Sequence, residues 1–552
     1  MNKVIINQDD FYIIPVGGCG EFGMNCTLYV HNGKVLIVDA GLSFAPEYEI
    51  GIDSHIVDIK SYIASLGEII GYVITHGHED HIGSLPFLLK NHPAPIYSGK
   101  WAMEILKNKL GVKKLPFEVN YFEEGKKLQI GPFEIQTITV PHSIPGCSSV
   151  AIRTEKANVF HTGDFKTQEY SSIEKPFDVD LLKEIGKSGF HCMLADSTNA
   201  HKEGKCPSED EVYDSVVDVI QGAKGYTLFT TFASNFWRLH TVLRAAKAAN
   251  KVVVPIGTGI NKSFRYASAC GIFNDKEFDI KQVNDLKTLD RKDVVLLVTG
   301  SQGEHKAALA RIVKNEHPKV SLKANDRVVF SSRAIPGNEK TIAEVISICS
   351  KNDVEIITPR DNNIHVSGHA YKGDIELFLE HIKPRFHLPV HGTFTQLKSN
   401  QNISFDNSDT MENGAVWKVS DDGVEKVGYI DPKILFVDSW SRLPMDFHTM
   451  RRRQKIGDSG LAIVDGVYCS KKKQFISELH METFGIPPLD KGEGWDTDLL
   501  RRTEKRFQKC LEDESFVLNR AAVEEFVRRQ VRKYLTSKLI KKPVVISRVH
   551  LV

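Results

Sequence analysis

The sequence lacks the long apolar segments that mark membrane and secreted proteins. No apolar run approaches the roughly 20 residues that are needed to cross a bilayer, and the first ten residues, MNKVIINQDD, contain no apolar stretch of the kind found in a signal peptide. The nine cysteines are scattered and form no CxxC pair, which argues against a disulfide framework and favours a reducing compartment. These absences predict a cytoplasmic protein with no membrane partner.

The chain also lacks an excess of charge of either sign. Its formal net charge is +1, so the whole molecule carries no basic signature for nucleic acid, although a groove can be positive in a neutral molecule. Hydrophobic residues make up 41% and charged residues 26%, which is ordinary for a soluble globular protein with an ample core. A chain of 552 residues is expected to form about three or four domains.

Three patterns follow one another along the chain. The first part is rich in strands: TLYV and KVLIVDAG flank an Asn-Gly hairpin signal, and IIGYVIT leads into His76. From about residue 208, apolar strands such as KGYTLFTTF and DVVLLVTG alternate with helical stretches, which predicts a parallel sheet with helices on both faces. Beyond about residue 450, a helix is predicted with one apolar face, formed by Val523, Phe526, Val527, Val531, Tyr534 and Leu535.

The most informative segment is HGHEDH, residues 76–81, directly after an apolar strand. It places four potential ligands within six positions: His76, His78, Asp80 and His81. Neutral imidazole nitrogen and carboxylate oxygen are the ligands that zinc takes, and Gly77 lets the backbone turn so that alternate side chains face two neighbouring ions. A histidine-rich surface loop is the alternative, but it does not account for four ligand types together at a strand end. Glu79 is expected to be a spacer.

HGHEDH resembles the HxHxDH signature of hydrolases of the metallo-β-lactamase superfamily, and the other motifs of that superfamily follow in its order. Asp39 in VLIVDAG resembles the first motif, an acid that orients the ligands. His142 in VPHSIPG, Asp164 in HTGDFK and His391 in LPVHGT match the remaining motifs. Taken alone, a distant histidine or aspartate is more often structural, but its place in this order favours a ligand.

The resemblance implies two zinc ions per chain, held by seven side chains: His76, His78, Asp80, His81, His142, Asp164 and His391. His76, His78 and His142 would hold one ion. Asp80, His81 and His391 would hold the other, and Asp164 would bridge the pair. Two ions about 4 Å apart can activate water and stabilise an in-line displacement at phosphorus.

The long interval between the last two motifs points to a nuclease. More than two hundred residues separate Asp164 from His391, and this stretch resembles the β-CASP domain of nucleic-acid-cleaving members of the superfamily. Asp196 in LADSTNA matches its first motif, His369 in HVSGHA its second, and His391 falls at its third. The resemblance implies that His369 and Asp196 form a catalytic acid/base pair that assists proton transfer.

Four further stretches, FTTFASN, VTGSQGE, SSRAIPGNE and HVSGHA, resemble the ribonuclease J family, as do GGCGEFGMN and the overall length. Each of the four is a strand followed by Ser, Gly or Asn at a helix start, where N–H and hydroxyl groups can face phosphate oxygens. A simple helix cap is the alternative for any single stretch. The resemblance implies RNA or phosphate binding by Phe232, Ala233, Ser234, Asn235, Ser331, Ser332, His365, Val366, Ser367, Gly368 and His369.

The resemblance also implies an α/β fold: an αββα metallo-β-lactamase sandwich with an inserted Rossmann-like β-CASP domain and a small C-terminal α/β domain. Residues 1–207 are expected to form the first part of the sandwich and residues 208–355 the β-CASP domain. Residues 356–435 would return to the sandwich with HVSGHA and the last zinc ligand. Residues 436–450 would be a linker, and residues 451–552 a domain used mainly for dimerisation.

The sequence departs from the ribonuclease J pattern after residue 390. The run Thr393-Phe394-Thr395 stands where an acid and a basic residue usually follow PVHG, and VDSWSRLPMD replaces a glycine-rich segment. Gly51 and Asp53 match positions that hold a structural calcium in some relatives, which makes Ca²⁺ a second cofactor to test. Pro444 stands where a further carboxylate of that site would be expected.

The expected function is that of a zinc-dependent ribonuclease with 5′-to-3′ exonuclease and endonuclease activity, acting in RNA processing and mRNA decay. Single-stranded RNA, preferably with a 5′-monophosphate, would enter the cleft between the sandwich and the β-CASP domain. A homodimer or homotetramer is expected, as is an RNA-degrading assembly. The basic patches at 451–453 and 471–473 either contact RNA or form an ordinary solvated surface.

Two alternatives stay open. The first is a β-CASP nuclease that acts on DNA; HVSGHA and the C-terminal part weigh against it, and matched RNA and DNA oligonucleotides would distinguish the two. The second is an inactive paralogue that serves as a scaffold in an RNA-degrading assembly. Such subunits typically lose zinc ligands, whereas this sequence retains all seven.

Overall fold

Contacts along the backbone divide the chain into two units. In the computed structural model, one unit comprises Met1–Ser43 and Ile56–Lys433, and the other comprises Phe44–His55 and Ile434–Val552. The structure describes residues 6–46, 48–335, 337–360, 362–404, 407–487, 489, 494–512, 517–539 and 541–552.

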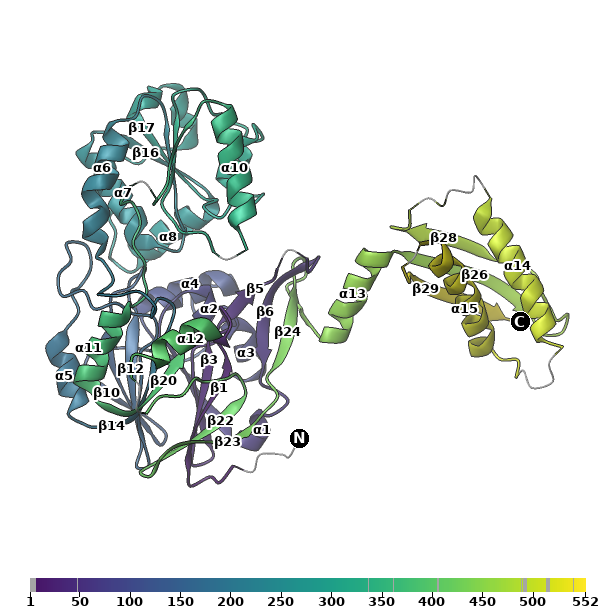
Figure 1. Ribbon diagram of the computed structural model, residues 1–552, viewed down its shortest axis with the longest axis horizontal. Coiled ribbons are helices and arrows are strands. Elements are labelled where there is room, and N and C mark those ends of the chain that lie inside the picture. Colours follow the sequence, from purple (N-terminus) through teal and green to yellow (C-terminus); the bar gives the residue numbers. More distant parts are fainter. Residues whose placement is uncertain are drawn as a thin grey trace. The chain divides into compact units, whose positions relative to one another are not determined.

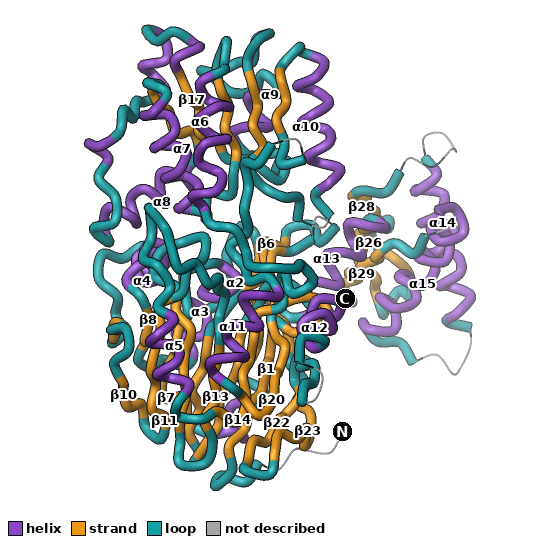
Figure 2. Tube along the Cα trace, turned by 60° about the vertical axis from the view of Figure 1, so that its left-hand side comes forward, coloured by secondary structure: helices purple, strands orange, loops and turns teal. Residues whose placement is uncertain are grey.

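The first unit contains two facing sheets (Figures 1 and 2). The first sheet has the strand order β23-β22-β1-β3-β4-β7-β8-β9. Its strands are β1 (Phe11–Gly17), β3 (Cys26–His31), β4 (Lys34–Val38), β7 (Glu68–Ile74), β8 (Ile96–Ser98), β9 (Val119–Tyr121), β22 (Ala415–Ser420) and β23 (Gly423–Tyr429). The second sheet has the order β10-β11-β12-β13-β14-β20. Its strands are β10 (Lys127–Ile130), β11 (Phe133–Thr139), β12 (Ser148–Arg153), β13 (Asn158–His161), β14 (Phe190–Asp196) and β20 (Pro384–Val390).

One apolar core lies between the two sheets, because side chains of both contribute to it. Tyr29 and Val73 of the first sheet pack with Ile152, Leu194 and Leu388 of the second. The outer faces are covered by helices, listed here with their bounds: α3 (Leu85–Asn91) and α4 (Lys100–Leu110) on the first sheet, α5 (Val179–Gly186) and α11 (Lys372–Ile382) on the second. The near-continuous burial of β4 follows from this arrangement, since both of its faces are covered. The expected αββα sandwich is confirmed.

A five-stranded sheet forms the β-CASP region, with the order β16-β17-β15-β18-β19 and parallel pairing throughout. Its strands are β15 (Thr227–Thr230), β16 (Val252–Ile256), β17 (Val294–Val298), β18 (Arg327–Phe330) and β19 (Glu355–Ile357). Its helices are α6 (Tyr213–Gln221), α7 (Phe236–Ala248), α8 (Thr258–Ala269), α9 (Ala308–Val313) and α10 (Glu339–Lys351).

Helices cover both faces of this sheet, as the sequence predicts. Phe229 and Leu297 pack toward α6, α7 and α8, whereas their neighbours Leu228 and Leu296 pack toward α9 and α10. Adjacent residues point to opposite faces because side chains alternate along a strand. The sheet spans residues 227–357, and the expected domain boundaries at 208 and 355 stay predictions.

The β-CASP region is inserted between two neighbouring strands of the sandwich. Strand β14 ends at Asp196, and β20 pairs with it in parallel, with Asp196 opposite Val390. Strand β13 pairs in parallel with the other side of β14. Since the ends of parallel strands meet at one edge of a sheet, the residues that follow β13, β14 and β20 converge there.

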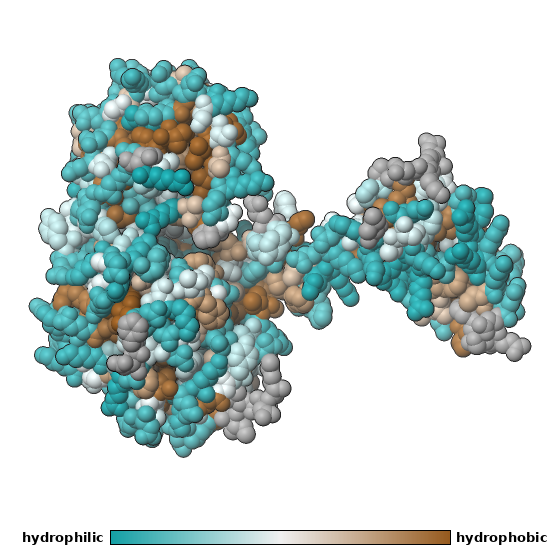
Figure 3. Space-filling view, in the orientation of Figure 1, coloured by the Kyte–Doolittle hydropathy of each residue, from teal (hydrophilic) through white to brown (hydrophobic). Residues whose placement is uncertain are grey.

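The second unit contains a small α/β domain. Its sheet has β27 (Gln474–Phe475), β26 (Leu461–Cys469) and β28 (His480–Phe484) in that order, with β29 (Val544–Leu551) on β26. Helices α14 (Trp495–Cys510) and α15 (Arg520–Leu539) pack on it (Figure 1). The predicted apolar face of α15 is confirmed: four of its members are buried and the other two are partly buried against the same core. The outer surface of α14 is hydrophilic in Figure 3.

The stretch expected to be a linker, 436–450, carries regular structure. It contains the end of β24 (Lys433–Asp438), the short β25 (Pro444–Met445) and the start of α13 (Phe447–Ser459). Within the described part of the chain, no helix combines the length and apolar character that a membrane crossing requires.

Candidate metal centre

Six strand ends deliver the candidate ligands to one edge of the sandwich. Asp39 follows β4, the HGHEDH segment follows β7, and His142 follows β11. Asp164 follows β13, Asp196 ends β14, and His391 follows β20. The seven predicted zinc ligands fall into two groups that share Asp164.

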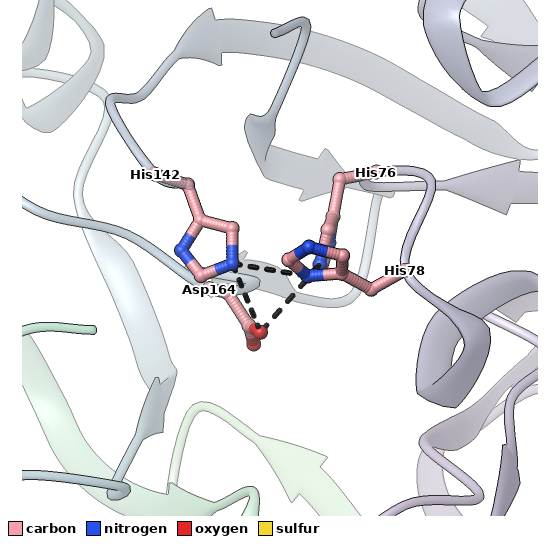
Figure 4. Close-up of side chains that lie close together, drawn as sticks. All are labelled: His76, His78, His142 and Asp164. Atoms are coloured by element: carbon pink, nitrogen blue, oxygen red, sulfur yellow. Dashed lines mark hydrogen bonds and ion pairs between the residues drawn. The ribbon is translucent and has the colours of Figure 1, made fainter. Parts of the chain in front are cut away.

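The first group consists of His76, His78, His142 and Asp164, whose ring nitrogens and carboxylate oxygen face one another (Figure 4). His76 Nε2 lies 3.0 Å from His78 Nδ1, and His142 Nε2 lies 3.2 Å from the same atom. Asp164 Oδ2 is 3.5 Å from His76 Nε2 and 3.7 Å from His142 Nε2. Burial lowers the pKa of His76 and His142 well below the usual value and that of His78 to about 4. These imidazoles are therefore neutral, which is the form that binds a metal.

The second group consists of Asp80, His81, Asp164 and His391. His81 Nε2 lies 3.3 Å from Asp164 Oδ2 and 3.6 Å from Asp80 Oδ2. His391 Nε2 lies 3.4 Å from Asp80 Oδ2, and its Nδ1 lies 3.1 Å from Asp164 Oδ1. Glu79 turns away from both groups, because Lys109 Nζ holds its carboxylate at 2.5 Å. The prediction that Glu79 is a spacer is consistent with this position.

The surroundings of Asp164 test whether these groups suit a metal. Asp164 is 2% exposed, and neither carboxylate oxygen has a hydrogen-bond partner among the described residues, although five histidines place a ring nitrogen within 3.1–3.7 Å. A buried carboxylate without hydrogen bonds is costly unless a cation neutralises it. Nitrogen and carboxylate donors of this kind suit borderline divalent ions. The two groups therefore fit divalent metal binding.

Hydrogen bonds behind the candidate ligands fix their orientation. Asp39 Oδ2 lies 2.7 Å from His81 Nδ1, and its Oδ1 accepts the backbone N–H of Thr75 at 2.8 Å. His142 Nδ1 lies 2.7 Å from the carbonyl oxygen of Gly368, so its Nε2 is left to face the metal centre. Such contacts set the tautomer and the ring orientation of a ligand. The structure thus places Asp39 where an orienting acid would act.

Asp196 and His369 meet beside the second group. Asp196 Oδ2 lies 2.9 Å from His369 Nδ1, and Asp196 Oδ1 lies 3.0 Å from His391 Nδ1. Burial lowers the pKa of His369, but the carboxylates of Asp196 and Asp164 outweigh it, so the net pKa is raised. The side chain of His369 is 23% exposed, so the ring can reach a substrate while it remains paired with Asp196.

The residues expected to bind RNA differ in how free their polar groups are. Ser234 is exposed at the end of β15. Asn235 is buried and caps α7, with its Oδ1 accepting the N–H of Arg238 at 3.0 Å. Ser331 is buried, and its hydroxyl donates to the carbonyl of Ile364 at 2.7 Å. The side chain of Asn235 therefore matches the helix-cap alternative, whereas the hydroxyl of Ser331 is used in a contact with the segment at Ile364.

Five of the remaining predicted RNA-binding residues, His365–His369, lie on the segment that leads to the metal centre. Ser367 Oγ accepts from Asn199 Nδ2 at 2.8 Å and from the N–H of His369 at 3.2 Å. A Cβ atom on Gly368 would lie 2.9 Å from the His142 ring, so a side chain there would displace a candidate ligand. Phe232 and Ala233, which follow β15, are half-buried, whereas Ser332 after β18 and Val366 are buried. His365 is half-buried, and its Nδ1 has no partner among the described residues.

The sequence analysis missed three residues near this site: Lys202, Arg333 and Tyr371. Lys202 Nζ lies 4.8 Å from the ring centre of Tyr371 and also donates to Asn199 Oδ1. Burial and the nearby charge of Arg333 lower the pKa of Lys202 to about 8. In the described part of the chain, no carboxylate forms an ion pair with Lys202 or Arg333. The only signal in the sequence is that Lys202 follows Asp196 by six residues in the loop after β14.

The residues expected to hold calcium have other partners. Asp53 pairs with the guanidinium of Arg442, and the carbonyl of Gly51 accepts the N–H of Ser439 at 3.0 Å. Neither residue belongs to a metal-ligating group among the described residues. The departure at Thr393 also has a local role, because Thr393 caps α12 (Phe394–Gln401) together with Gln396. These contacts give no support to a calcium site at Gly51 and Asp53.

Comparisons with known proteins identify the family. Three family models match successive parts of the chain: the metallo-β-lactamase superfamily at residues 19–180, the β-CASP domain of ribonuclease J at 224–348, and the ribonuclease J C-terminal domain at 448–552. Ribonuclease J of Helicobacter pylori is 31% identical over 550 residues, which cover 98% of this chain and 79% of the relative. The chain belongs to the ribonuclease J family. As a member of the ribonuclease J family, it is a nuclease of the hydrolase class.

Other relatives agree with this result. Ribonuclease J 1 of Streptococcus pyogenes is 32% identical over 472 residues, which cover 84% of each chain. A solved structure of a protein of unknown function from Enterococcus faecalis matches 74% of this chain and 100% of its own, with a TM-score of 0.51 and 13% identity. The latter likeness concerns the fold alone. The sequence-based interpretation of the family and the fold is confirmed.

Proposed function

We propose that this protein is a zinc-dependent ribonuclease that degrades single-stranded RNA from the 5′ end and also cleaves internally. The observation that carries this proposal is the buried carboxylate of Asp164, which two ligand groups share. Beside it lie Asp196 and His369, whose Oδ2 and Nδ1 atoms are 2.9 Å apart. A shared carboxylate with a proton-transfer pair at one edge suits hydrolysis of a phosphodiester.

The ligand set supports two zinc ions. His76, His78 and His142 would hold one with Asp164, and the second group would hold the other. Bound there, two divalent ions would supply a nucleophile from water at neutral pH and stabilise charge at phosphorus. Seven ligand-type residues are too many for one tetrahedral site.

The protein's own residues would supply the proton transfer. His369 Nδ1 is held by Asp196, so Nε2 is the ring nitrogen left to deliver a proton to the leaving oxygen. The carboxylates of Asp196 and Asp164 raise the pKa of His369, which favours the protonated ring. The 23% exposure of the ring leaves room for the leaving group to approach.

The RNA would run past the segments that border the centre. Ser234, Ser367 and Gly368 offer hydroxyl or N–H groups, and we add Lys202 and Arg333 as two cations without a carboxylate partner among the described residues. Phosphate contacts of this kind position a strand without reading its sequence. A closed pocket at the end of this path would accept a 5′-monophosphate and disfavour a triphosphate, which carries more bulk and charge.

We also propose a homodimer or homotetramer in the cytoplasm, within an RNA-degrading assembly that acts in mRNA decay. The second unit carries large exposed apolar side chains, which suit a protein–protein contact. Their exposed fractions are 72% for Phe44, 74% for Tyr48, 71% for Ile50 and 93% for Trp440. The match of residues 448–552 to the C-terminal domain of ribonuclease J supports the same proposal.

The proposal is tested by metal analysis of the purified protein together with digestion of a 5′-labelled RNA and a DNA of the same sequence. We expect about two zinc ions per chain, with mononucleotides released from the RNA and little cleavage of the DNA. Equal cleavage of both would favour the DNA-acting alternative. An absence of cleavage with the metals in place would favour the scaffold alternative.

A further inference from the structure

Arg238 joins the two chain segments that connect the sandwich with the β-CASP sheet. It lies on α7 and is 0% exposed. Its Nε and Nη2 atoms form a bidentate pair with Glu209, with Nη2 at 3.0 Å from Oε2. Its Nη1 donates to the carbonyl of Ile364 at 2.7 Å and to Ser331 at the end of β18. Glu209 lies on the outgoing segment and Ile364 on the returning one.

The returning segment carries the proposed proton donor. Residues 364–369 are IHVSGH, so the carbonyl that Arg238 holds lies five residues before His369. At the other end of this segment, the carbonyl of Gly368 contacts the candidate ligand His142 at 2.7 Å, and His369 contacts Asp196 at 2.9 Å. The segment is therefore held at the metal centre by one end and at the β-CASP sheet by Arg238 at the other.

A buried ion pair is a poor means of stabilising a fold, since the loss of hydration offsets much of the attraction between the charges. A planar guanidinium, however, can donate several hydrogen bonds in fixed directions, which a lysine ammonium cannot reproduce. Arg238 uses this geometry to contact Glu209, Ser331 and Ile364 at once. The arrangement favours a role in geometry over one in stability.

We propose that Arg238 is a positioning residue of the nuclease reaction: by holding the carbonyl of Ile364, it sets the place of His369 at the metal centre. This inference rests on the proposed role of His369 in proton transfer. Arg238 itself does not touch the metal centre. Replacement of its guanidinium leaves the metals bound and the RNA path intact. The ring of His369, however, can then leave the geometry that proton transfer requires.

The test compares Arg238→Lys with a control variant at a second ion-paired arginine of the β-CASP region. Arg291 also pairs with a buried aspartate, Asp326, and stacks on Tyr226 at 3.7 Å, but it lies just before β17, at the end of the sheet opposite to that of Ser331. We expect Arg238→Lys to lower kcat at least tenfold with an unchanged zinc content and a KM within about twofold. Both variants should lower the unfolding temperature by similar amounts, but Arg291→Lys should leave kcat unchanged.

A double-mutant cycle with His369→Ala identifies the residue through which Arg238 acts. We expect Arg238→Lys to have no further effect on kcat once His369 is absent. The inference is overturned if Arg238→Lys lowers kcat by the same factor in the wild type and in His369→Ala. It is also overturned if Arg291→Lys lowers kcat as much as Arg238→Lys does. Should Arg238→Lys not fold, Glu209→Gln takes its place in the cycle with His369→Ala, and the same results support or overturn the inference. If His369→Ala alone leaves kcat unchanged, the proposed function of His369 fails instead.

Discussion

Asp196 Oδ2 and His369 Nδ1 lie 2.9 Å apart, although 173 positions separate the two residues in the chain. The other oxygen of the same carboxylate lies 3.0 Å from Nδ1 of His391, a candidate metal ligand. One aspartate therefore links the proposed proton donor to the metal centre. Because the backbone N–H and hydroxyl of Thr198 also donate to Asp196, at 2.9 and 2.7 Å, the carboxylate is fixed in place.

Replacement of His369 separates metal binding from proton transfer. His369→Ala should lower kcat by roughly 100-fold or more, the usual scale of general acid/base assistance, and leave the zinc content at the wild-type value. His240→Ala on α7 is the matched control and should retain both activity and metal. Since Asp164, Asp196, His369 and His391 could also hold an ion, a loss of zinc from His369→Ala would make His369 a ligand and contradict its assigned role.

The second ligand group can be emptied by changes within one motif. Replacement of Asp80 and His81 together by Ala should reduce the zinc content from about two ions to one per chain and abolish cleavage, while circular dichroism stays unchanged. Glu79→Gln is the control, because Glu79 lies between the ligands but pairs with Lys109. It should keep both ions and near-normal activity. Near-normal ribonuclease activity of the double variant would refute the two-metal mechanism.

The 5′ end of the substrate should control the rate. One RNA prepared with a 5′-monophosphate, a 5′-triphosphate or a 5′-hydroxyl should be degraded fastest with the monophosphate or the hydroxyl, because a closed pocket disfavours the larger and more charged triphosphate. The products are followed by gel electrophoresis, and mononucleotides should appear from the 5′ end. Equal rates for the three ends, with only internal fragments, would mean that the enzyme is chiefly an endonuclease.

Lys202 should make RNA binding depend on pH. Its pKa, lowered to about 8 by burial and by Arg333, means that the ammonium is present below pH 8 and lost above it. The KM for RNA should therefore rise between pH 7 and pH 9, by roughly three- to tenfold, the scale of one partly exposed charge-assisted contact. Lys202→Arg keeps its charge over this range and should remove the rise. The same rise in both enzymes would exclude a contact between Lys202 and phosphate.

Local patterns were sufficient to predict much of the fold and those candidate metal ligands that are adjacent in sequence. HGHEDH is visible because its members are adjacent in sequence, and the apolar face of α15 is visible because a helix repeats every 3.6 residues. The distant members, His142, Asp164 and His391, could be assigned only by the order of motifs in a family. No property of an isolated histidine distinguishes a ligand from a core residue.

Interactions between distant segments could not be predicted from the sequence. Whether a polar residue at a strand end faces solvent or the interior depends on what packs against it, and this is why Ser331 and Asn235 are used by the fold while Ser234 is exposed. Arg238 falls in an ordinary helical pattern, and its role arises from segments at residues 209 and 364. The low pKa of Lys202 likewise arises from burial and from Arg333, which is more than a hundred positions away in the chain.

The insertion of the β-CASP region between β14 and β20 also fixes when the enzyme can become active during its synthesis. His391 lies beyond β20, so a chain still emerging from the ribosome has every other candidate ligand long before it has His391. The N-terminal sheets can form early, since domains fold as they are made. A nascent chain shorter than 391 residues lacks His391 and cannot assemble the full centre, so its own activity must wait until translation has passed that codon.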